Sequence, residues 1–106
     1  MSMKIGCDIV QITRVKALSP DAKQKIFHPS EMKNAKPDTL AGIIAAKESV
    51  RKIENSLGWL DIEVRKETTG KPTIKLHKQT NVQTIDISIS HDGEYAIASA
   101  IAVLKD

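Results

Sequence analysis

The sequence predicts an α+β protein, built as one domain, in which a long helix packs against strands joined as hairpins. Apolar residues recur every three to four positions between Leu40 and Leu57, as they do on one face of a helix. Apolar and polar residues alternate in residues 60–65 and again in 85–90, as they do in half-buried strands. Because 106 residues suffice for one core and no more, we expect residues 1–106 to form a single domain.

The first third of the chain predicts one strand and then short helical segments. Residues 3–10 are rich in isoleucine and valine and are expected to form a strand. Asp8 lies in the middle of this strand, where aspartate is uncommon, so its presence needs a reason. Short helices are expected in residues 11–18 and 21–27, and a weaker helical signal follows in residues 30–36 between two prolines.

The long helix is predicted to begin after Asp38 or Thr39, either of which can cap it, and to run to about Ser56, with Gly58 as its stop. A helix turns about 100° per residue, so its residues sort into stripes. One stripe combines small side chains with a carboxylate and a lysine: Ala41, Ala45, Glu48 and Lys52. The opposite stripe is apolar and is expected to pack inward: Ile43, Ala46, Val50, Ile53 and Leu57.

Two hairpins are predicted after the helix. The first joins residues 60–65 to residues 72–76 through a turn at Thr68–Lys71. The second joins residues 85–90 to residues 94–104 through a tight two-residue turn that contains glycine. Strands joined in this way run antiparallel.

The last strand, which follows Asp92-Gly93, is apolar on both faces. One face carries large side chains: Tyr95, Ile97, Ile101 and Val103. The other carries Ala96, Ala98, Ala100 and Ala102. A strand of this kind is covered on both faces, so we expect helices over one face and another subunit over the alanine face.

Composition disfavours several functions. The chain has only three aromatic residues, so it lacks a stacking platform for single-stranded nucleic acid. A single cysteine, with no apolar leader before the fold, predicts a cytoplasmic location. No apolar run approaches the roughly 20 residues that span a bilayer. The net charge of +3 favours an anionic partner, either phosphates or an acidic protein.

Each polar candidate has an ordinary explanation when it is taken alone. Asp8 can pair with Arg14, and a Glu48–Lys52 ion pair on a solvated helix face is worth about 0.2–0.5 kcal/mol. His91 at a hairpin corner is more often a turn residue than a catalyst. Serines at alternate positions of a strand, as at 88 and 90, usually form its polar face. The prediction therefore rests on the set as a whole.

As a set, these residues suit a metal-bound phosphate. Mg²⁺ is usually held by one or two carboxylates together with substrate phosphates and water, and Asp8 and Glu48 can supply the carboxylates. The chain has no zinc-spaced Cys/His cluster, Walker loop or GxGxxG motif, which disfavours zinc hydrolysis, ordinary ATP use and nicotinamide chemistry. Phosphoryl transfer is the leading class. The donors available for phosphate oxygens are Lys47, Lys52, Lys71, Ser88, Ser90 and His91.

Five segments of the chain carry a family resemblance: Gly6–Val10 with Arg14, Leu40–Glu48, Trp59–Val64, Gly70–Pro72 and Ser88–Ala96. In content and order they resemble the small phosphopantetheinyl transferases of the holo-acyl carrier protein synthase type. The segments span nearly the whole chain. The resemblance implies an α+β fold in which a long helix is wrapped by an antiparallel sheet. It also implies a homotrimer with active sites between neighbouring subunits.

The resemblance further implies the reaction, which is transfer of 4′-phosphopantetheine from coenzyme A to a serine of an apo-acyl carrier protein, releasing adenosine 3′,5′-bisphosphate. By position, Asp8 and Glu48 would hold Mg²⁺, and Glu48 would take the serine proton directly or through a metal-bound water. Lys52 would contact phosphate or assist proton movement, Lys47 would neutralise phosphate charge, and Arg14 would face the acidic carrier protein. The residues lining coenzyme A would be Gly70, Lys71, Pro72, Ser88, Ser90 and His91.

The chain departs from the family pattern in places. Ile43 and Ile44 stand where the family usually has arginine and phenylalanine, and Gln11 replaces a common acidic residue. The segment between Phe27 and Leu40 is also short. Two alternatives stay open, the first because of these departures and the second because of the basic pI and small size of the chain. One is a catalytically weak relative that binds coenzyme A or acts as an interaction subunit, and the other is a small basic nucleic-acid-binding domain, which the scattered lysines disfavour.

Overall fold

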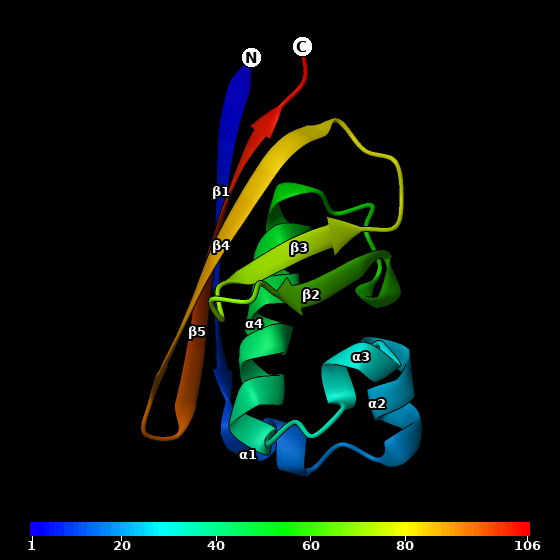
Figure 1. Cartoon of the computed structure of the whole chain (residues 1–106), viewed down its shortest axis with the longest axis vertical. Coiled ribbons are helices and arrows are strands. Elements are labelled where there is room, and N and C mark those ends of the chain that lie inside the picture. The colour runs from blue at the N-terminus through cyan, green and yellow to red at the C-terminus, as the bar shows by residue number, and fades with distance from the viewer.

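A three-stranded antiparallel sheet forms one layer of the computed structural model, which describes residues 1–106. Its strands lie in the order β1 (Ser2–Gln11), β5 (Tyr95–Leu104), β4 (Val82–Asp92). Helix α4 (Pro37–Ile53) lies along one face of this sheet (Figure 1). The α+β class and the antiparallel sheet are thus confirmed. The turn between β4 and β5 lies one residue later than predicted, at Gly93-Glu94, where Gly93 takes a positive φ of 57°.

The remaining elements cover the other side of α4. Strands β2 (Ile62–Lys66) and β3 (Pro72–Leu76) form a separate two-stranded hairpin. The short helices are α1 (Ile12–Lys16), α2 (Pro20–Ile26), α3 (Pro29–Met32) and the 3₁₀ turn η1 (Trp59–Asp61). In Figure 1, α2 and α3 lie beside α4 near one end, and the β2–β3 hairpin crosses it. Residues 60 and 61 belong to η1, so strand β2 begins later than the alternating pattern predicts.

Helix α4 begins and ends earlier than predicted. Pro37 occupies its first turn, where the fixed φ of proline suits a helix, and Lys36 is the N-cap residue in place of Asp38 or Thr39. At the other end Glu54 is already extended, with φ −135° and ψ 93°. The chain turns away there because Leu57 packs into the core, and the Leu57 carbonyl accepts a hydrogen bond from Arg51 Nε at 2.9 Å. The prediction of Gly58 as the helix stop is therefore wrong.

The close approach of α4 to the sheet depends on small residues. A Cβ atom at Gly6 on β1 would lie 2.0 Å from the backbone oxygen of Ser49, so only glycine fits there. Ser49 Oγ lies 2.7 and 3.0 Å from the carbonyl oxygens of Ala45 and Ala98, which share its single proton. The four alanines of β5 are buried on this face. The alanine face therefore packs on α4, and the prediction that another subunit covers it is wrong.

The large side chains of β5 lie on the outer face of the sheet. Ile97 and Ile101 are 41% and 43% exposed. They pair in register with Ile9 and Ile5 of β1, which are 59% and 75% exposed. An apolar surface of this kind on a folded chain marks an interaction site. We call Met3, Ile5, Ile9, Tyr95, Ile97 and Ile101 the outer sheet face.

The core lies between α4 and the elements around it. Most of both stripes of α4 is buried, because strands β1, β4 and β5 contact one side of the helix and α1, α3 and β2 contact the rest; Glu48 and Lys52, near its C-terminal end, reach the surface. Ala41 and Ala45 on the stripe of Glu48 are as buried as Ala46 and Val50 on the apolar stripe. The longest helix has 17 residues, and no helix of the structure has the length and hydropathy needed to cross a membrane.

Candidate functional site

Asp8 on β1 faces α4 and has one carboxylate oxygen without a partner. Its Oδ1 lies 3.4 Å from Nζ of Lys52. Lys52 also donates a hydrogen bond of 2.6 Å to the carbonyl oxygen of Cys7, which fixes the ammonium beside the carboxylate. Oδ2 of Asp8 is buried and makes no hydrogen bond. A buried carboxylate oxygen without a donor is costly, so this geometry suits completion by a cation.

Glu48 lies one helical turn before Lys52 on α4. Its Oε1 is 3.4 Å from Nη2 of Arg14 on α1, and the Glu48 side chain is 26% exposed. Together with Arg51, Lys52 and Asn55, Glu48 lines a surface depression of about 240 Å³. Since Lys52 also contacts Asp8, the predicted groups gather around the C-terminal half of α4. We call Asp8, Arg14, Glu48 and Lys52 the carboxylate cluster.

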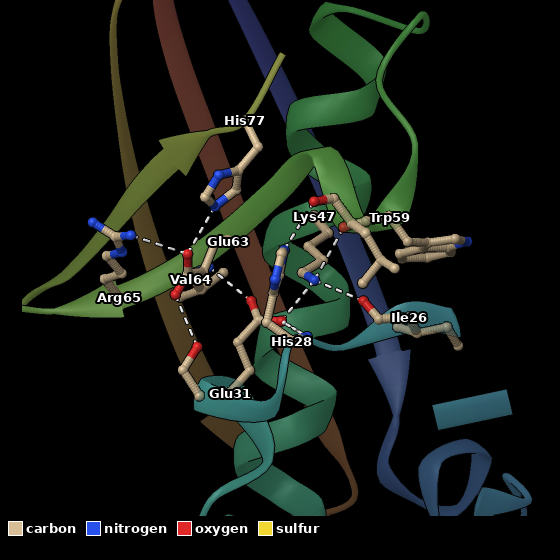
Figure 2. Close-up of polar contacts among 11 residues, drawn as sticks. Ile26, His28, Glu31, Lys47, Trp59, Glu63, Val64, Arg65 and His77 are labelled. Atoms are coloured by element: carbon tan, nitrogen blue, oxygen red, sulfur yellow. Dashed lines mark hydrogen bonds and ion pairs between the residues drawn. The ribbon is translucent and has the colours of Figure 1, made fainter. Parts of the chain in front are cut away.

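Lys47, which we predicted as a phosphate ligand, lies elsewhere. Its side chain is fully buried, and Nζ donates to Glu31 Oε1 at 2.8 Å and to the carbonyl oxygens of Ile26 and Trp59 at 2.7 and 3.1 Å (Figure 2). These bonds use all three donors of the ammonium. Burial lowers the pKa of Lys47, and the hydrogen bond and charge of Glu31 oppose that shift. Lys47 therefore has no hydrogen left for a phosphate, and the prediction is corrected to a structural role.

Three of the predicted coenzyme A residues meet at a second, larger cavity of about 730 Å³. Gly70, Pro72 and His91 line it. His91 Nε2 is 2.9 Å from the carbonyl oxygen of Asp38, so this nitrogen carries the proton and donates. A Cβ atom at Gly42 would lie 3.0 Å from the same nitrogen, so a glycine at this position makes room for the His91 ring. The lining also includes the basic residues Lys33, Arg65 and Lys66.

The other predicted coenzyme A residues lie outside this cavity. Ser88 and Ser90 pair in register with Ser99 and Ile97, so they project from the outer face of the sheet, whereas His91 pairs with Ala96 on the helix side. Lys71 Nζ is 3.5 Å from Asp86 Oδ1 in an exposed ion pair. Within one chain, the structure therefore divides the predicted set between the two faces of β4.

The cavity and the depression beside the carboxylate cluster share no lining residue. Helix α4 contributes Thr39 and Ile43 to the cavity, from its N-terminal half. It contributes Glu48 and Lys52 to the depression, from its C-terminal half. One chain thus carries a basic cavity and a carboxylate cluster at different places along the same helix.

Comparison with known proteins assigns the chain to a family. The sequence profile of the 4′-phosphopantetheinyl transferase superfamily matches residues 4–100. The chain belongs to this superfamily. Among its relatives is the holo-[acyl-carrier-protein] synthase of Alkaliphilus metalliredigens, which is 41% identical over 117 residues, covering 92% of this chain and 96% of the relative. The enzyme of the same name from Chlorobaculum parvum is 39% identical and covers 93% and 97% of the two chains.

Solved structures of holo-[acyl-carrier-protein] synthases share the fold. The Helicobacter pylori holo-[acyl-carrier-protein] synthase in complex with coenzyme A superimposes with a TM-score of 0.84 at 33% identity, covering 94% of this chain and all of the other. The Bacillus anthracis enzyme in complex with coenzyme A (3′,5′-ADP) also gives a TM-score of 0.84, at 28% identity, and covers 99% and 100% of the chains.

The sequence did not predict several residues that line the basic cavity and the depression beside the carboxylate cluster. Asn55 is one of them, and it lies in the turn that follows the end of α4, where the helical period no longer applies. Lys33 and Arg65 are also missed. No local pattern signals them, because they come from α3–α4 and β2 and meet only when the hairpin packs beside α4.

Proposed function

We propose that this phosphopantetheinyl transferase is a holo-acyl carrier protein synthase. It transfers 4′-phosphopantetheine from coenzyme A to a serine of an apo-acyl carrier protein, releasing adenosine 3′,5′-bisphosphate. The observation that carries the proposal is the unpartnered Oδ2 of Asp8 beside Lys52, in a cluster that also contains Glu48. The relatives named holo-[acyl-carrier-protein] synthase, over nearly their full length, support it.

Mg²⁺ is the metal that this donor set fits best. Asp8 and Glu48 offer hard carboxylate oxygens, and Oδ2 of Asp8 has no hydrogen-bond donor to lose. Two protein carboxylates, completed by pyrophosphate and water, form an ordinary magnesium site. When bound, the ion neutralises charge on the phosphates between which the bond breaks. The four residues of the carboxylate cluster include no histidine or cysteine, the ligands that favour zinc over magnesium.

The protein side chains then have separate tasks. Lys52, already held by the Cys7 carbonyl oxygen, presents its ammonium to a phosphate oxygen or to the leaving group. Glu48 accepts the proton of the attacking serine, directly or through water, and its partial exposure leaves it reachable by a carrier protein. Arg14 is 52% exposed and lies 3.4 Å from Glu48, so it is next to the surface at which a carrier protein would reach Glu48. Its charge suits an acidic carrier.

Coenzyme A occupies the basic cavity with its nucleotide portion. Gly70 and Pro72 form one wall and His91 another, and Lys33, Arg65 and Lys66 supply positive charge for phosphate groups. Ile43 lines the same cavity at a position where the family usually has a charged side chain. This apolar wall is the observation that favours the second candidate, a weak relative that binds coenzyme A with little transfer.

A homotrimer would join the two halves of the active site. The outer sheet face exposes six large apolar side chains, which a second copy of the chain would cover. Ser88 and Ser90 lie beside this face, so an adjacent subunit would bring them and the basic cavity toward a neighbour's carboxylate cluster. Such an assembly would account for the separation of the basic cavity from the carboxylate cluster within one chain. We place the enzyme in the cytoplasm, where its carrier protein and coenzyme A would be available.

The deciding experiment is a transfer assay read by mass spectrometry. The purified protein is incubated with coenzyme A, Mg²⁺ and a panel of apo-acyl carrier proteins, and the carriers are weighed before and after. A gain of one phosphopantetheine group on a carrier serine, absent when EDTA is present, is the expected result. Unchanged carriers, together with coenzyme A binding by calorimetry, would instead support the weak relative. Analytical ultracentrifugation of the same sample tests the trimer.

A further inference from the structure

Two histidines and a glutamate meet on the side of the β2–β3 hairpin that faces α3. His28 is the N-cap residue of α3, Glu63 lies on β2, and His77 follows the last residue of β3. One ligand atom from each lies within 4.8 Å of the other two. The imidazole rings are tilted by 38°, with centroids 5.1 Å apart. Figure 2 shows the three side chains near one another, with His77 bonded to the Glu63 carboxylate. The proposed transfer reaction gives no chemical step to any of the three.

The surroundings fix the tautomer of His28. Its Nε2 is 2.9 Å from the carbonyl oxygen of Leu60, which can only accept, so Nε2 carries the proton. The neutral ring then has a lone pair on Nδ1. Histidines that bind metals commonly donate their other ring N–H to a backbone carbonyl, which orients the ring. The Leu60 contact is of this kind, so Nδ1 is the nitrogen with which His28 would bind an ion.

Glu63 is an ionised carboxylate surrounded by donors. His77 Nε2 is 2.8 Å from Oε1, Arg65 Nη2 is 3.2 Å from the same oxygen, and Ser30 Oγ donates to Oε2 at 2.8 Å. These hydrogen bonds, that of His77 foremost, lower the pKa of Glu63 to about 2. The Arg65 side chain is 54% exposed, so it can withdraw into solvent when a cation takes its place.

We propose that His28, Glu63 and His77 form a binding site for a divalent transition-metal ion of the zinc type, with water as the remaining ligand. Two imidazoles and one carboxylate suit Zn²⁺ and its neighbours, whereas Mg²⁺ prefers oxygen ligands alone. The site is separate from the carboxylate cluster in both ligand type and position.

Metal binding requires a small closure of the three groups. Zinc ligands at about 2.0–2.1 Å in a tetrahedral arrangement lie on the order of 3.4 Å from one another. The widest separation in the cluster is within 4.8 Å, so closure by roughly 1.4 Å is the most that is needed. His77 is 37% exposed and lies beyond the end of β3, so its ring is free to make this movement. The ion displaces the proton that His77 shares with Glu63.

The bound ion would tie three segments of the chain together. The ligand Glu63, and Ser30 which donates a hydrogen bond to it, also line the basic cavity proposed for coenzyme A. Metal binding would therefore fix the position of α3 against the hairpin that forms one wall of this cavity. The metal site itself does not depend on the proposed function, because its ligands and its test are independent of transfer.

Zinc titration tests the proposal. The full chain, carrying Asp8→Asn so that the carboxylate cluster cannot compete, is freed of metal and titrated with Zn²⁺ against a chromophoric chelator. We expect saturable binding of one ion per chain, with the imidazole signals of His28 and His77 shifting in ¹H–¹⁵N spectra. His28→Gln and His77→Gln keep a hydrogen-bonding side chain but remove the imidazole, and each should weaken zinc binding by at least about 10-fold.

The third histidine supplies a matched control. His91 lies in the basic cavity, outside the cluster, and His91→Gln should leave zinc affinity unchanged. Melting curves in EDTA show whether each variant is folded before metal is added. Absence of saturable zinc binding in a folded parent chain would overturn the proposal, as would equal affinity in all three histidine variants.

Discussion

Lys47 and Glu48 are neighbours in the sequence, yet they belong to different parts of the molecule. Lys47 extends to the α2–η1 side of α4, where it is fully buried against Glu31. Glu48 extends to the α1 side, where it meets Arg14 and borders an open depression. Both belong to ion pairs. The two sides of the helix differ in whether every carboxylate oxygen there has a hydrogen-bond donor.

The carboxylates on the two sides make the difference clear. Glu31 accepts hydrogen bonds at both oxygens, from Lys47 Nζ and from the backbone N–H groups of His28 and Val64, at 2.7 to 2.8 Å. Asp8 leaves one buried oxygen with no donor at all. A saturated buried carboxylate holds segments of the chain together, whereas an unsaturated one retains a place for a ligand. Substitutions on the two sides should therefore affect different measurements.

The largest effect is expected at the carboxylate cluster, where one oxygen of Asp8 has no hydrogen-bond donor. Asp8→Asn and Glu48→Gln keep the side-chain shapes and remove the charges that would hold Mg²⁺, so transfer to the carrier should fall by about 10³-fold or more. The free energy of unfolding should change by less than about 1 kcal/mol, because both carboxylates are in weak ion pairs. The mass-spectrometric transfer assay and urea unfolding measure the two quantities. Parallel losses in both would show that these carboxylates are structural.

The buried pair of Lys47 and Glu31, whose hydrogen bonds are all made, should give the opposite result. Lys47→Met leaves the buried Glu31 carboxylate without its cation, and removal of one partner from such a pair costs about 3–5 kcal/mol of unfolding free energy. Lys52→Met is the matched control, since Lys52 is 54% exposed and its loss should cost less than about 1 kcal/mol. Urea unfolding compares the two variants. Equal stabilities would remove the contrast between the two sides of α4.

A smaller, pH-dependent effect is expected at Glu63, on the saturated side. Its pKa is about 2 in the folded chain, against an ordinary value of 4.5. Between these values the unfolded chain binds more protons, so the stabilisation is complete above about pH 5 and is lost as the pH falls toward 2. Its size should be on the order of 1–2 kcal/mol. Urea unfolding at pH 6 and about pH 3, in EDTA, should show a shallower pH dependence for Glu63→Gln than for the parent chain. An unchanged pH dependence would contradict this account.

The smallest effect is expected at Arg14, on the rim of the unsaturated side. Arg14→Ala removes a half-exposed charge, so kcat/KM for the acidic carrier should fall by roughly 10-fold at low salt and by less at high salt. The affinity for coenzyme A should stay the same. Steady-state kinetics at two ionic strengths measures both. A loss that is independent of salt would indicate that Arg14 acts through Glu48 instead.

The sequence was sufficient for the order and type of nearly every element, because hydrophobic period, proline and glycine act over a few residues. It also predicted that Asp8 and Glu48 belong to one site, which stays a prediction; in the structure Asp8 contacts Lys52, and Glu48 lines the same depression as Lys52. A resemblance in five ordered segments led to the family that the comparisons show. These conclusions depend on which residues are present and on their spacing.

The tertiary structure alone decided which face of each element is covered. Periodicity shows that the alanines of β5 share a face, but only the packing of α4 on Gly6 and Ala98 makes that face the inner one. In the same way, Lys47 became structural because Glu31, from a distant segment, reaches it. The cluster of His28, Glu63 and His77 has no sequence signature either. The physical reason is that a local pattern fixes how residues share a surface, whereas long-range packing determines what that surface meets.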